Sequence, residues 1–272
     1  RRAVMVCSKT TLKWTGGGHG VGVEGGHNFT RRPGYALKSL GRIPPQAGLR
    51  DAGHVLGPLA AAPAVIAKRT KELGVALVDI GAGTTGIAIY EEGDILYSSV
   101  IPVGAGHITN DLAIGLKTSV ENAEKIKIKY VRAHTSKANL SEKIRIEELD
   151  SEEGDNVITR RELQNIAGAR LDEIFQLVRA ELRKVGKDLM LPGGVVLTGG
   201  GAKMTGIEEM AKEALQLPVT VGKPEGFTGI VDRINDPAFA AAVGLMLENM
   251  THSQMAPESN ATLGETVSRI KK

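Results

Sequence analysis

The sequence has 272 residues, of which 42% are hydrophobic and 24% are charged. This composition is typical of a folded globular protein and excludes extensive disorder. The longest apolar stretch without charge, residues 52–67, contains Pro58 and Pro63 and is too short and too interrupted to cross a bilayer. A single cysteine, Cys7, excludes a disulfide framework and a cysteine metal cluster, so we expect a reducing, cytoplasmic setting.

The first fifty residues differ from the rest of the chain in charge and in pattern. They hold nine Lys and Arg against one acidic residue, Glu24, and ten of the 34 glycines. No period of 2 or 3.6 persists there, so we treat 1–52 as an unassigned Gly/Arg-rich leader. It is interpreted as a basic arm, as a disordered segment, or as non-native sequence read in a wrong frame. Because the basic residues are scattered, we expect no nucleic-acid partner.

A sharper pattern begins near residue 73. Residues 75–78 form a β-rich run that ends at Asp79, a glycine turn follows at 81–83, and residues 84–90 and 95–103 read as two further strands. Residues 108–131 then read as one amphipathic helix. Three strands joined by tight turns and followed by a helix predict an antiparallel meander that leads into an α/β layer.

The second half of the chain predicts a small insertion followed by a return to alternating strands and helices. Thr159, with Glu162 three positions later, predicts a capped helix that runs to about Val185. The other elements expected here are strands at 143–146, 157–158, 195–197 and 218–221, helices at 206–215 and 237–248, and a polar tail at 251–272.

The first glycine turn matches G-x-G-x-x-G over residues 81–86, but a strand follows it, so we reject a dinucleotide fingerprint. No G-x-x-x-x-G-K-[ST] occurs, which excludes a P-loop of that type. A strand–turn–strand hairpin can still bind phosphate through backbone N–H groups, with hydroxyls from Thr84 and Thr85. Asp79 could hold Mg²⁺ through water. The alternative is a plain β-turn with a solvated aspartate.

A second glycine turn, residues 199–201, follows another strand and opens toward a helix. Three glycines there indicate close backbone approach to a flat or phosphorylated ligand. With Glu124 and Lys127 on the helix between the two turns, the pattern predicts a nucleotide cleft.

These motifs together resemble a known superfamily. Residues 78–89 resemble the second phosphate motif of the actin, Hsp70 and sugar-kinase ATPases, residues 195–204 their adenosine motif, and residues 236–245 and 56–61 their two connecting segments. The stretches 106–116 and 123–127 resemble, within that superfamily, the FtsA family of bacterial cell-division proteins. The resemblance covers about residues 53–250.

The resemblance implies an α/β fold, an actin-like (ribonuclease H-like) ATPase domain with a small inserted α+β subdomain. It places the second half of the actin-like domain at 53–133 and 190–250 and the insertion at 134–189. It also implies that the tail, 251–272, is truncated before a membrane-targeting amphipathic helix, since residues 268–272 resemble the first turn of one.

The resemblance also implies roles for individual residues. Those facing phosphate and Mg²⁺ would be Asp79, Gly81, Gly83, Thr84 and Thr85, with the metal held by Asp79 through water. Those on the ribose and adenosine side would be Glu124, Lys127, Gly199, Gly200, Gly201 and Lys203. Arg170 and Arg161, on the helix that starts at residue 160, would lie near a bound peptide of FtsZ.

The implied function is a cell-division scaffold that binds ATP, self-associates and tethers the FtsZ ring to the cytoplasmic face of the membrane. Its implied partners are the C-terminal FtsZ peptide, other copies of itself, other division proteins and, only with the terminal helix restored, the membrane. The sequence departs from the family pattern at Gly57, Ala82 and Gly86, and it lacks a first phosphate hairpin. These differences predict a fragment with weak nucleotide binding and no meaningful ATPase activity. The alternatives are a pilus or secretion assembly protein, a sugar-kinase or Hsp70-like ATPase, and a gene remnant.

Overall fold

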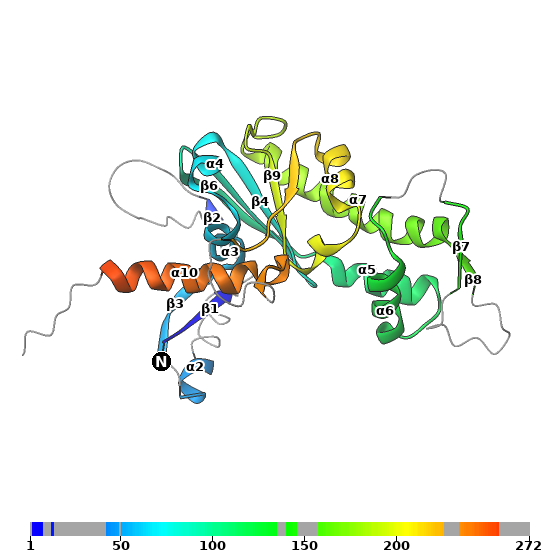
Figure 1. Cartoon of the computed structure of the whole chain (residues 1–272), viewed down its shortest axis with the longest axis horizontal. Coiled ribbons are helices and arrows are strands. Elements are labelled where there is room, and N and C mark those ends of the chain that lie inside the picture. The colour runs from blue at the N-terminus through cyan, green and yellow to red at the C-terminus, as the bar shows by residue number, and fades with distance from the viewer. Residues whose placement is uncertain are drawn as a thin grey trace, which may run out of the picture.

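The computed structural model describes residues 2–7, 12–13, 42–48, 50–134, 140–145, 157–225 and 234–255 (Figure 1). The strands are β1 (Arg2–Cys7), β2 (Leu12–Lys13), β3 (Arg50–Leu56), β4 (Val75–Ile80), β5 (Thr85–Glu91), β6 (Asp94–Ile101), β7 (Lys143–Arg145), β8 (Val157–Thr159), β9 (Val195–Thr198) and β10 (Val219–Val221). The helices are α2 (Ile43–Gln46), α3 (Gly57–Val65), α4 (Lys68–Leu73), α5 (Ala105–Gly115), α6 (Val120–Tyr130), α7 (Arg160–Lys184), α8 (Ile207–Leu215) and α10 (Ala240–Met255), with 3₁₀ turns η2 (Gly200–Lys203) and η3 (Pro237–Phe239).

A six-stranded sheet with the order β10-β9-β4-β5-β6-β2 forms the centre of the molecule. β4, β5 and β6 pair in antiparallel fashion, which confirms the predicted meander, and β9 and β10 join parallel to β4. All but one of the residues of β4 are fully buried, as expected for a central strand covered on both faces.

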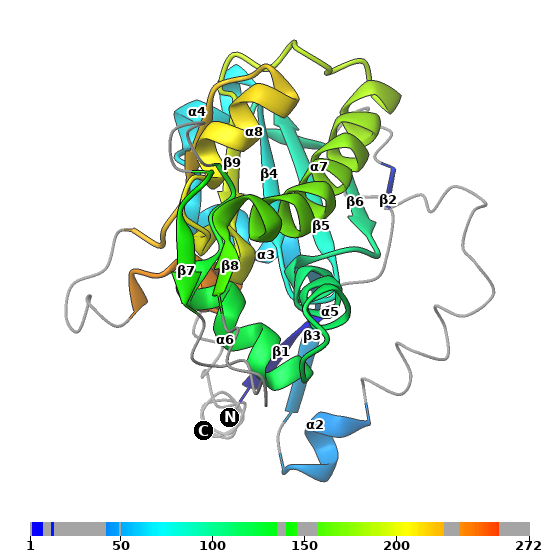
Figure 2. The ribbon, with the colours of Figure 1, turned by 90° about the vertical axis from the view of Figure 1, so that its right-hand side faces the viewer.

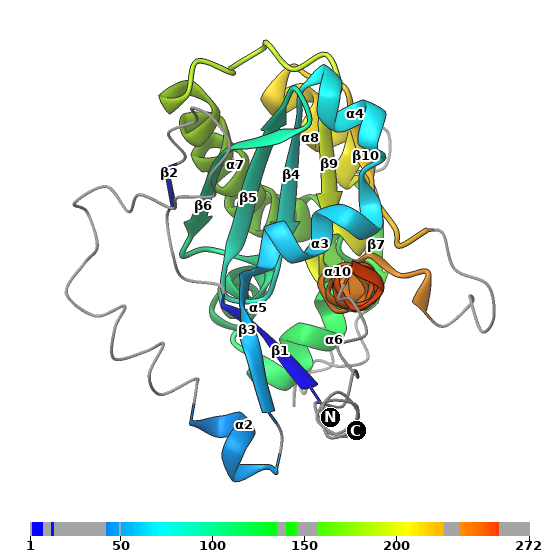
Figure 3. The ribbon, with the colours of Figure 1, turned by 90° about the vertical axis from the view of Figure 1, so that its left-hand side faces the viewer.

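Helices cover both faces of this sheet. α7, α5 and α8 lie on one face (Figure 2), and α3 and α10 lie on the other (Figure 3). Thr159 and Glu162 form the predicted capping box of α7, because the Thr159 hydroxyl accepts a hydrogen bond from the Glu162 N–H and the Glu162 carboxylate accepts one from the Thr159 N–H. The buried side of α7 is apolar at helical spacing, with Leu163, Leu171, Ile174, Phe175, Val178 and Leu182 in the core.

α3 and α10 cross at very close range. A Cβ atom at Gly244 of α10 would lie 1.7 Å from the carbonyl oxygen of Ala60 in α3, so only glycine fits at this position. The alanines of α3 that face the crossing, Ala60 and Ala61, are completely buried. Small residues on both helices therefore bring the two backbones into contact.

The prediction of a single helix over residues 108–131 is wrong. The structure has two helices there, α5 and α6, separated by Lys117 at a φ of 51° and by Ser119, which caps α6 by accepting a hydrogen bond from the N–H of Asn122. The apolar period continues across the break, which is why the pattern reads as one helix. The capping serine is the local signal for the second helix.

The leader contains regular elements that the sequence pattern did not predict. β1 pairs in parallel with β3, and β2 pairs with β6 at the edge of the six-stranded sheet. Both contacts join backbone groups, which need no side-chain period. The boundary placed at residue 52 falls inside β3, and the tail placed at 251 begins inside α10. Residues 256–272, whose last five residues were compared with the first turn of a membrane-targeting helix, lie outside the described residues.

The described helices include none that combines the length and the apolar character needed to cross a bilayer.

Candidate functional site

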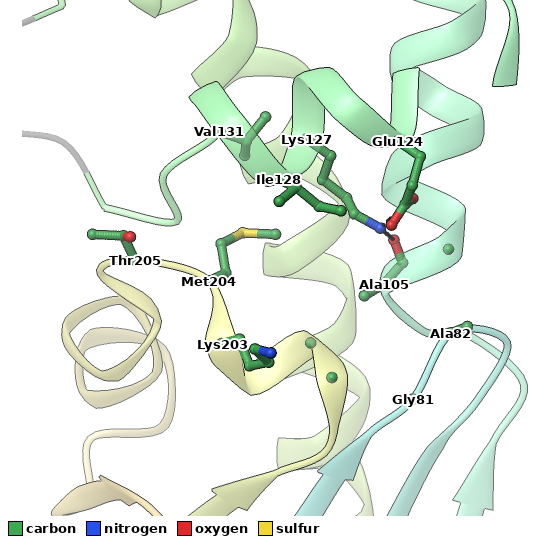
Figure 4. A pocket seen from close by; sticks show the side chains of 13 residues that line it. Gly81, Ala82, Ala105, Glu124, Lys127, Ile128, Val131, Lys203, Met204 and Thr205 are labelled. Atoms are coloured by element: carbon green, nitrogen blue, oxygen red, sulfur yellow. Dashed lines mark hydrogen bonds and ion pairs between the residues drawn. The ribbon is translucent and has the colours of Figure 1, made fainter. Parts of the chain in front are cut away.

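The two glycine turns lie side by side because the strands that precede them are neighbours. β4 and β9 run parallel, with Asp79 opposite Thr198 in the register, so both strands end at the same edge of the sheet. A cavity of about 360 Å³ opens there (Figure 4). It is lined by Gly81, Ala82, Ala105, Gly106, Glu124, Lys127, Ile128, Val131, Gly200, Gly201, Lys203, Met204 and Thr205.

The first turn is fixed by backbone hydrogen bonds to the start of α5. The N–H of Ala105 donates to the carbonyl of Gly81 at 2.8 Å, and the N–H of Gly106 donates to the carbonyl of Ala82 at 2.7 Å. A Cβ atom at Gly104 would lie 2.5 Å from the Gly81 oxygen. The glycine turn at residues 81–83 and the N-terminal end of α5 therefore form one rigid unit. Because the N–H groups of Ala105 and of Gly106, the partner of Ala82, are already bonded, they are not available to an anion.

α6 contributes a charged pair to the cavity. The Lys127 ammonium lies 2.7 Å from the Glu124 carboxylate and also donates to the Thr109 hydroxyl at 2.8 Å and to the Ala105 carbonyl at 3.3 Å. Burial alone would raise the pKa of Glu124, but hydrogen bonds from Lys127 and Thr109 outweigh it and hold that pKa below its ordinary value. Glu124 is therefore a carboxylate at neutral pH.

The second turn is shaped by close packing against the end of β4. Gly199 has a φ of 85°, and a Cβ atom there would lie 2.4 Å from Oδ1 of Asp79. A Cβ atom at Gly201 would lie 2.4 Å from Cγ2 of Ile80, whereas one at Gly200 would meet nothing within 4 Å. Two of the three glycines are thus required by packing, and Gly200 is the one that leaves open space.

The predicted phosphate-side residues divide between the cavity and its support. Gly81 lines the cavity, and Gly83 lines a second, adjoining cavity of about 670 Å³ that shares Ala82, Gly106 and Glu124 with the first. Thr85 is fully buried, and its hydroxyl donates to the carbonyl of Val103 at 2.8 Å. Neither cavity is lined by Asp79, Thr84, Thr85 or Gly199.

Asp79 is the penultimate residue of β4, next to the start of the first glycine turn. Burial raises the pKa of its carboxyl group, and the part of the chain that the structure describes gives it no ion pair. Within the same described residues, no group of three or more His, Cys, Asp or Glu side chains could hold a metal ion. A single partly buried carboxylate nevertheless suits Mg²⁺, which takes most of its ligands from water and phosphate.

A comparison with known proteins decides the family. A family model described as "Cell division protein FtsA" matches residues 76–244, which is more than half of the chain. The chain belongs to the FtsA family.

Curated relatives and solved structures agree with this assignment. The FtsA proteins of Pseudomonas aeruginosa and Bacillus subtilis are each 39% identical, over 78% and 77% of this chain and 51% and 46% of their own lengths. The chain thus spans about half the length of these relatives. MreB5 of Spiroplasma citri bound to ADP has a TM-score of 0.63 at 20% identity, over 84% of this chain and 68% of its own. PilM in a type IV pilus complex has a TM-score of 0.59 at 19% identity, over 78% and 57%.

These neighbours confirm the predicted fold class, an actin-like α/β domain. The family match favours the FtsA interpretation of the sequence over the sugar-kinase and pilus-assembly alternatives.

The two arginines assigned to a partner lie away from the cavities of this FtsA-family chain. The Arg170 guanidinium donates to both carboxylate oxygens of Asp111 in α5, at 2.7 and 2.9 Å, and also to Glu173. It therefore ties α7 to α5. Arg161 is exposed on the first turn of α7, where its backbone N–H donates to the carbonyl of Leu140.

Several cavity residues were not singled out by the sequence. Ile128 and Met204 lie across from each other in the cavity, and Ile128 is exposed whereas Ala123 and Ile126 of the same helix are buried (Figure 4). An isoleucine off the buried face of α6 was the available signal. Thr109 lies inside the FtsA-like stretch, but its contact with Glu124 joins two helices and leaves no mark in the local pattern.

Proposed function

We propose that this protein is an ATP-binding scaffold of bacterial cell division, the function implied by its family. The observation that carries the nucleotide part of the proposal is the cavity between two glycine turns, which is lined by the carboxylate of Glu124 and by the apolar side chains of Ile128 and Met204. The cavity and its neighbour together have the volume of a typical ligand site.

In the proposed complex, adenosine passes over Gly200 and Gly201 toward Lys203, the ribose lies near Glu124 and Lys127, and the phosphates lie over Gly81 and Gly83. Gly200 and Gly83 support this placement, because a Cβ atom at either would meet no protein atom within 4 Å. Thr84 would add a hydroxyl donor, and Thr85 would support the turn through its bond to Val103.

Mg²⁺, held by Asp79 through water, would neutralise phosphate charge when nucleotide is bound. The partly buried Asp79 carboxyl would gain a cation that the described residues do not supply. We expect no meaningful ATP hydrolysis. The candidate general bases that line the second cavity, His107, Glu121 and Glu124, come from α5 and α6 and not from the glycine turn at the phosphate end.

The test of nucleotide binding is a ligand-detected NMR titration with unlabelled Mg·ATP. Gly200→Phe fills open space in the cavity, so we expect affinity to fall at least tenfold while the fold is kept. Thr220→Phe, on an exposed position of β10, is the matched control and should bind as the unmodified protein does. Equal affinity for all three proteins, or no binding at millimolar nucleotide, would contradict the proposal.

We also propose that the surface of α7 binds the C-terminal peptide of FtsZ. Exposed arginine is suited to carboxylates of a partner, and Arg161 is not ion-paired to any described residue. Arg170 is already engaged by Asp111, so its contribution would be to position α7 on α5.

Peptide affinity of charge variants tests this second proposal. Arg161→Glu should weaken binding about fivefold or more, and increasingly so at low salt. Lys212→Glu, an equal change of charge at an exposed site on α8, should have little effect. If both reversals weaken binding alike, the effect is one of net charge and the α7 site is wrong.

For the whole protein we propose self-association and tethering of the FtsZ ring to the cytoplasmic face of the membrane. Sedimentation velocity with and without Mg·ATP measures the first, and co-sedimentation with FtsZ filaments measures the second. Self-association without any binding to FtsZ would favour a scaffold of another assembly, as the fold shared with the pilus protein PilM would allow.

A further inference from the structure

Helix α5 contacts both of the regions to which a ligand has been assigned, the first glycine turn and α7. At its start, the N–H of Ala105 donates to the Gly81 carbonyl at 2.8 Å. The N–H of Gly106 donates to the Ala82 carbonyl at 2.7 Å, and a Cβ atom at Gly106 would lie 2.8 Å from the same oxygen. Helix and turn are therefore in direct backbone contact, and a displacement of the turn also displaces α5.

Further along, α5 is joined to α7 by a two-bond ion pair. The Arg170 guanidinium donates through Nε to one carboxylate oxygen of Asp111 at 2.7 Å and through Nη2 to the other at 2.9 Å. One helical turn later, a Cβ atom at Gly115 would lie 2.7 Å from Cδ1 of Ile166, so the two helices are also close there. Two parallel bonds fix the direction as well as the distance between the partners, so α7 keeps one orientation on α5 while the pair holds.

The pair lies outside both ligand regions. Asp111 is about 9 Å along the helix from Ala105, and it lines neither of the two cavities. Arg161, the residue proposed to contact the peptide, lies in the first turn of α7, well before Arg170 on the same helix. A third donor of Arg170, Nη1, is bonded to Glu173 of α7 itself, which holds the guanidinium in place. The pair thus connects the two regions and belongs to neither.

Two ligands that need the same ordered elements affect each other's binding. Ordering a helix and its side chains lowers the conformational entropy, and this opposes binding. A ligand on the glycine turn orders α5, and through the ion pair it also orders the part of α7 that the peptide needs. The second ligand then has less left to order and binds more tightly. Equilibrium linkage requires the same factor in both directions.

We propose that Asp111, through its two bonds with Arg170, couples the glycine turn at 81–83 to the peptide-binding face of α7, so that Mg·ATP and the peptide each strengthen the binding of the other. The inference rests on the two binding sites proposed above and adds the regulation of one by the other. Asp111 touches neither ligand in this arrangement and is a positioning residue.

The test measures the affinity of a fluorescent C-terminal peptide of FtsZ by anisotropy, without nucleotide and with saturating Mg·ATP. We expect Mg·ATP to lower the Kd of the peptide by about fivefold or more, the usual size of coupling between two sites. Saturating unlabelled peptide should lower the Kd of Mg·ATP by the same factor in the NMR titration. Asp111→Asn keeps the size of the side chain but removes its charge, and it should reduce both factors to less than about twofold.

Three further variants control the measurement. Asp188→Asn makes the same change at a carboxylate that is 21% exposed and that pairs with Arg179 and Arg183 of α7, so it should keep both factors. Asp111→Glu retains the charge and should restore coupling in part. Arg170→Lys keeps the positive charge and loses the fork of donors, so it should also reduce the factors. This variant tests the pair from its other side if Asp111→Asn does not fold.

The outcomes separate this inference from the proposed function. If the unmodified protein binds both ligands but Mg·ATP leaves the peptide affinity equal or weaker, the inference is overturned and both sites stand. Coupling that persists in Asp111→Asn, or that is lost equally in Asp188→Asn, also overturns it. Loss of peptide binding by Asp111→Asn without nucleotide would make Asp111 part of the peptide site and not a link. If the unmodified protein binds only one of the two ligands, the site proposed for the other fails, and the inference fails with it.

Discussion

The wall built by α5 and α6 and the wall built by η2 face each other across one cavity, but different forces shape them. On the first wall, hydrogen bonds join Gly81 to Ala105, Ala82 to Gly106, and Lys127 to both Thr109 and Glu124. On the second wall, the glycine turn is held by contact of its backbone with β4, and the polar side chain there, Lys203, turns away to Asp236.

This difference teaches where each wall is sensitive. A hydrogen-bonded wall loses stability when a donor or acceptor is removed, because its buried partner is left without a bond. A wall of packed glycines loses stability when any atom is added. Substitutions matched to each wall are therefore expected to lower the free energy of unfolding by different amounts.

Gly199→Ala should have the largest effect. The new Cβ atom would lie 2.4 Å from Asp79 Oδ1 and 2.6 Å from the Ile80 oxygen, at a φ of 85° that favours glycine. We expect a loss of about 3 kcal/mol or more in the free energy of unfolding, measured by urea denaturation. Gly200→Ala is the control on the same turn and should change stability little, since its Cβ would meet nothing within 4 Å. If both substitutions lower the free energy of unfolding equally, the second wall is not held by packing.

Lys127→Met should have the next largest effect. It keeps the aliphatic stem but removes the charged donor that Ala105 O, Thr109 and Glu124 share, and leaves Glu124 with the hydrogen bond from Thr109 alone. We expect a loss of about 2 kcal/mol in the free energy of unfolding. Lys125→Met on the same helix, at an exposed position, is the control. A loss no greater than the control's would show that the first wall does not depend on its polar network.

Asp79→Asn should raise stability at neutral pH. Burial raises the pKa of Asp79, so the folded protein keeps this proton to a higher pH than the unfolded chain does. Stability therefore falls as pH rises from the ordinary aspartate value through the raised one. The asparagine variant lacks that fall, and we expect a gain of about 1 kcal/mol at pH 8. Denaturation midpoints at several pH values measure it, and parallel pH profiles for the two proteins would contradict it.

Lys203→Ala should have the smallest effect on stability. Its ion pair with Asp236 is formed by a side chain that is 53% exposed, and such pairs contribute little. We expect a change below about 0.5 kcal/mol in the free energy of unfolding. Nucleotide affinity, by contrast, should change in this variant, because Lys203 lines the cavity. A large loss of stability would mean that the second wall also depends on its polar contact.

The sequence predicted best what local chemistry determines. The meander of β4, β5 and β6 follows from β-branched alternation between turn residues, and α7 follows from the Thr159–Glu162 pair and a regular apolar stripe. The break between α5 and α6 was missed because a continuous apolar period concealed the cap at Ser119. β1 and β2 were missed because they pair with β3 and β6 through backbone groups, and such pairing needs no side-chain period.

The site was predicted in its residue types and less well in their roles. Glu124, Lys127, Gly200 and Gly201 do meet at one cavity. The engagement of Lys127 by three acceptors, and the packing of Gly199 and Gly201 on β4, depend on contacts between segments that are distant in the chain. Such contacts leave no signal in a single sequence.

The parallel pairing of β4 with β9 also has a kinetic consequence. The two glycine turns belong to strands separated by the whole of β5 to α7, so the cavity does not exist until the chain has closed that long loop and β9 has paired. Pairings of this kind form late and slowly. A ligand of the cavity would then bind only molecules that have completed the sheet, so it would slow unfolding without speeding the early steps of folding.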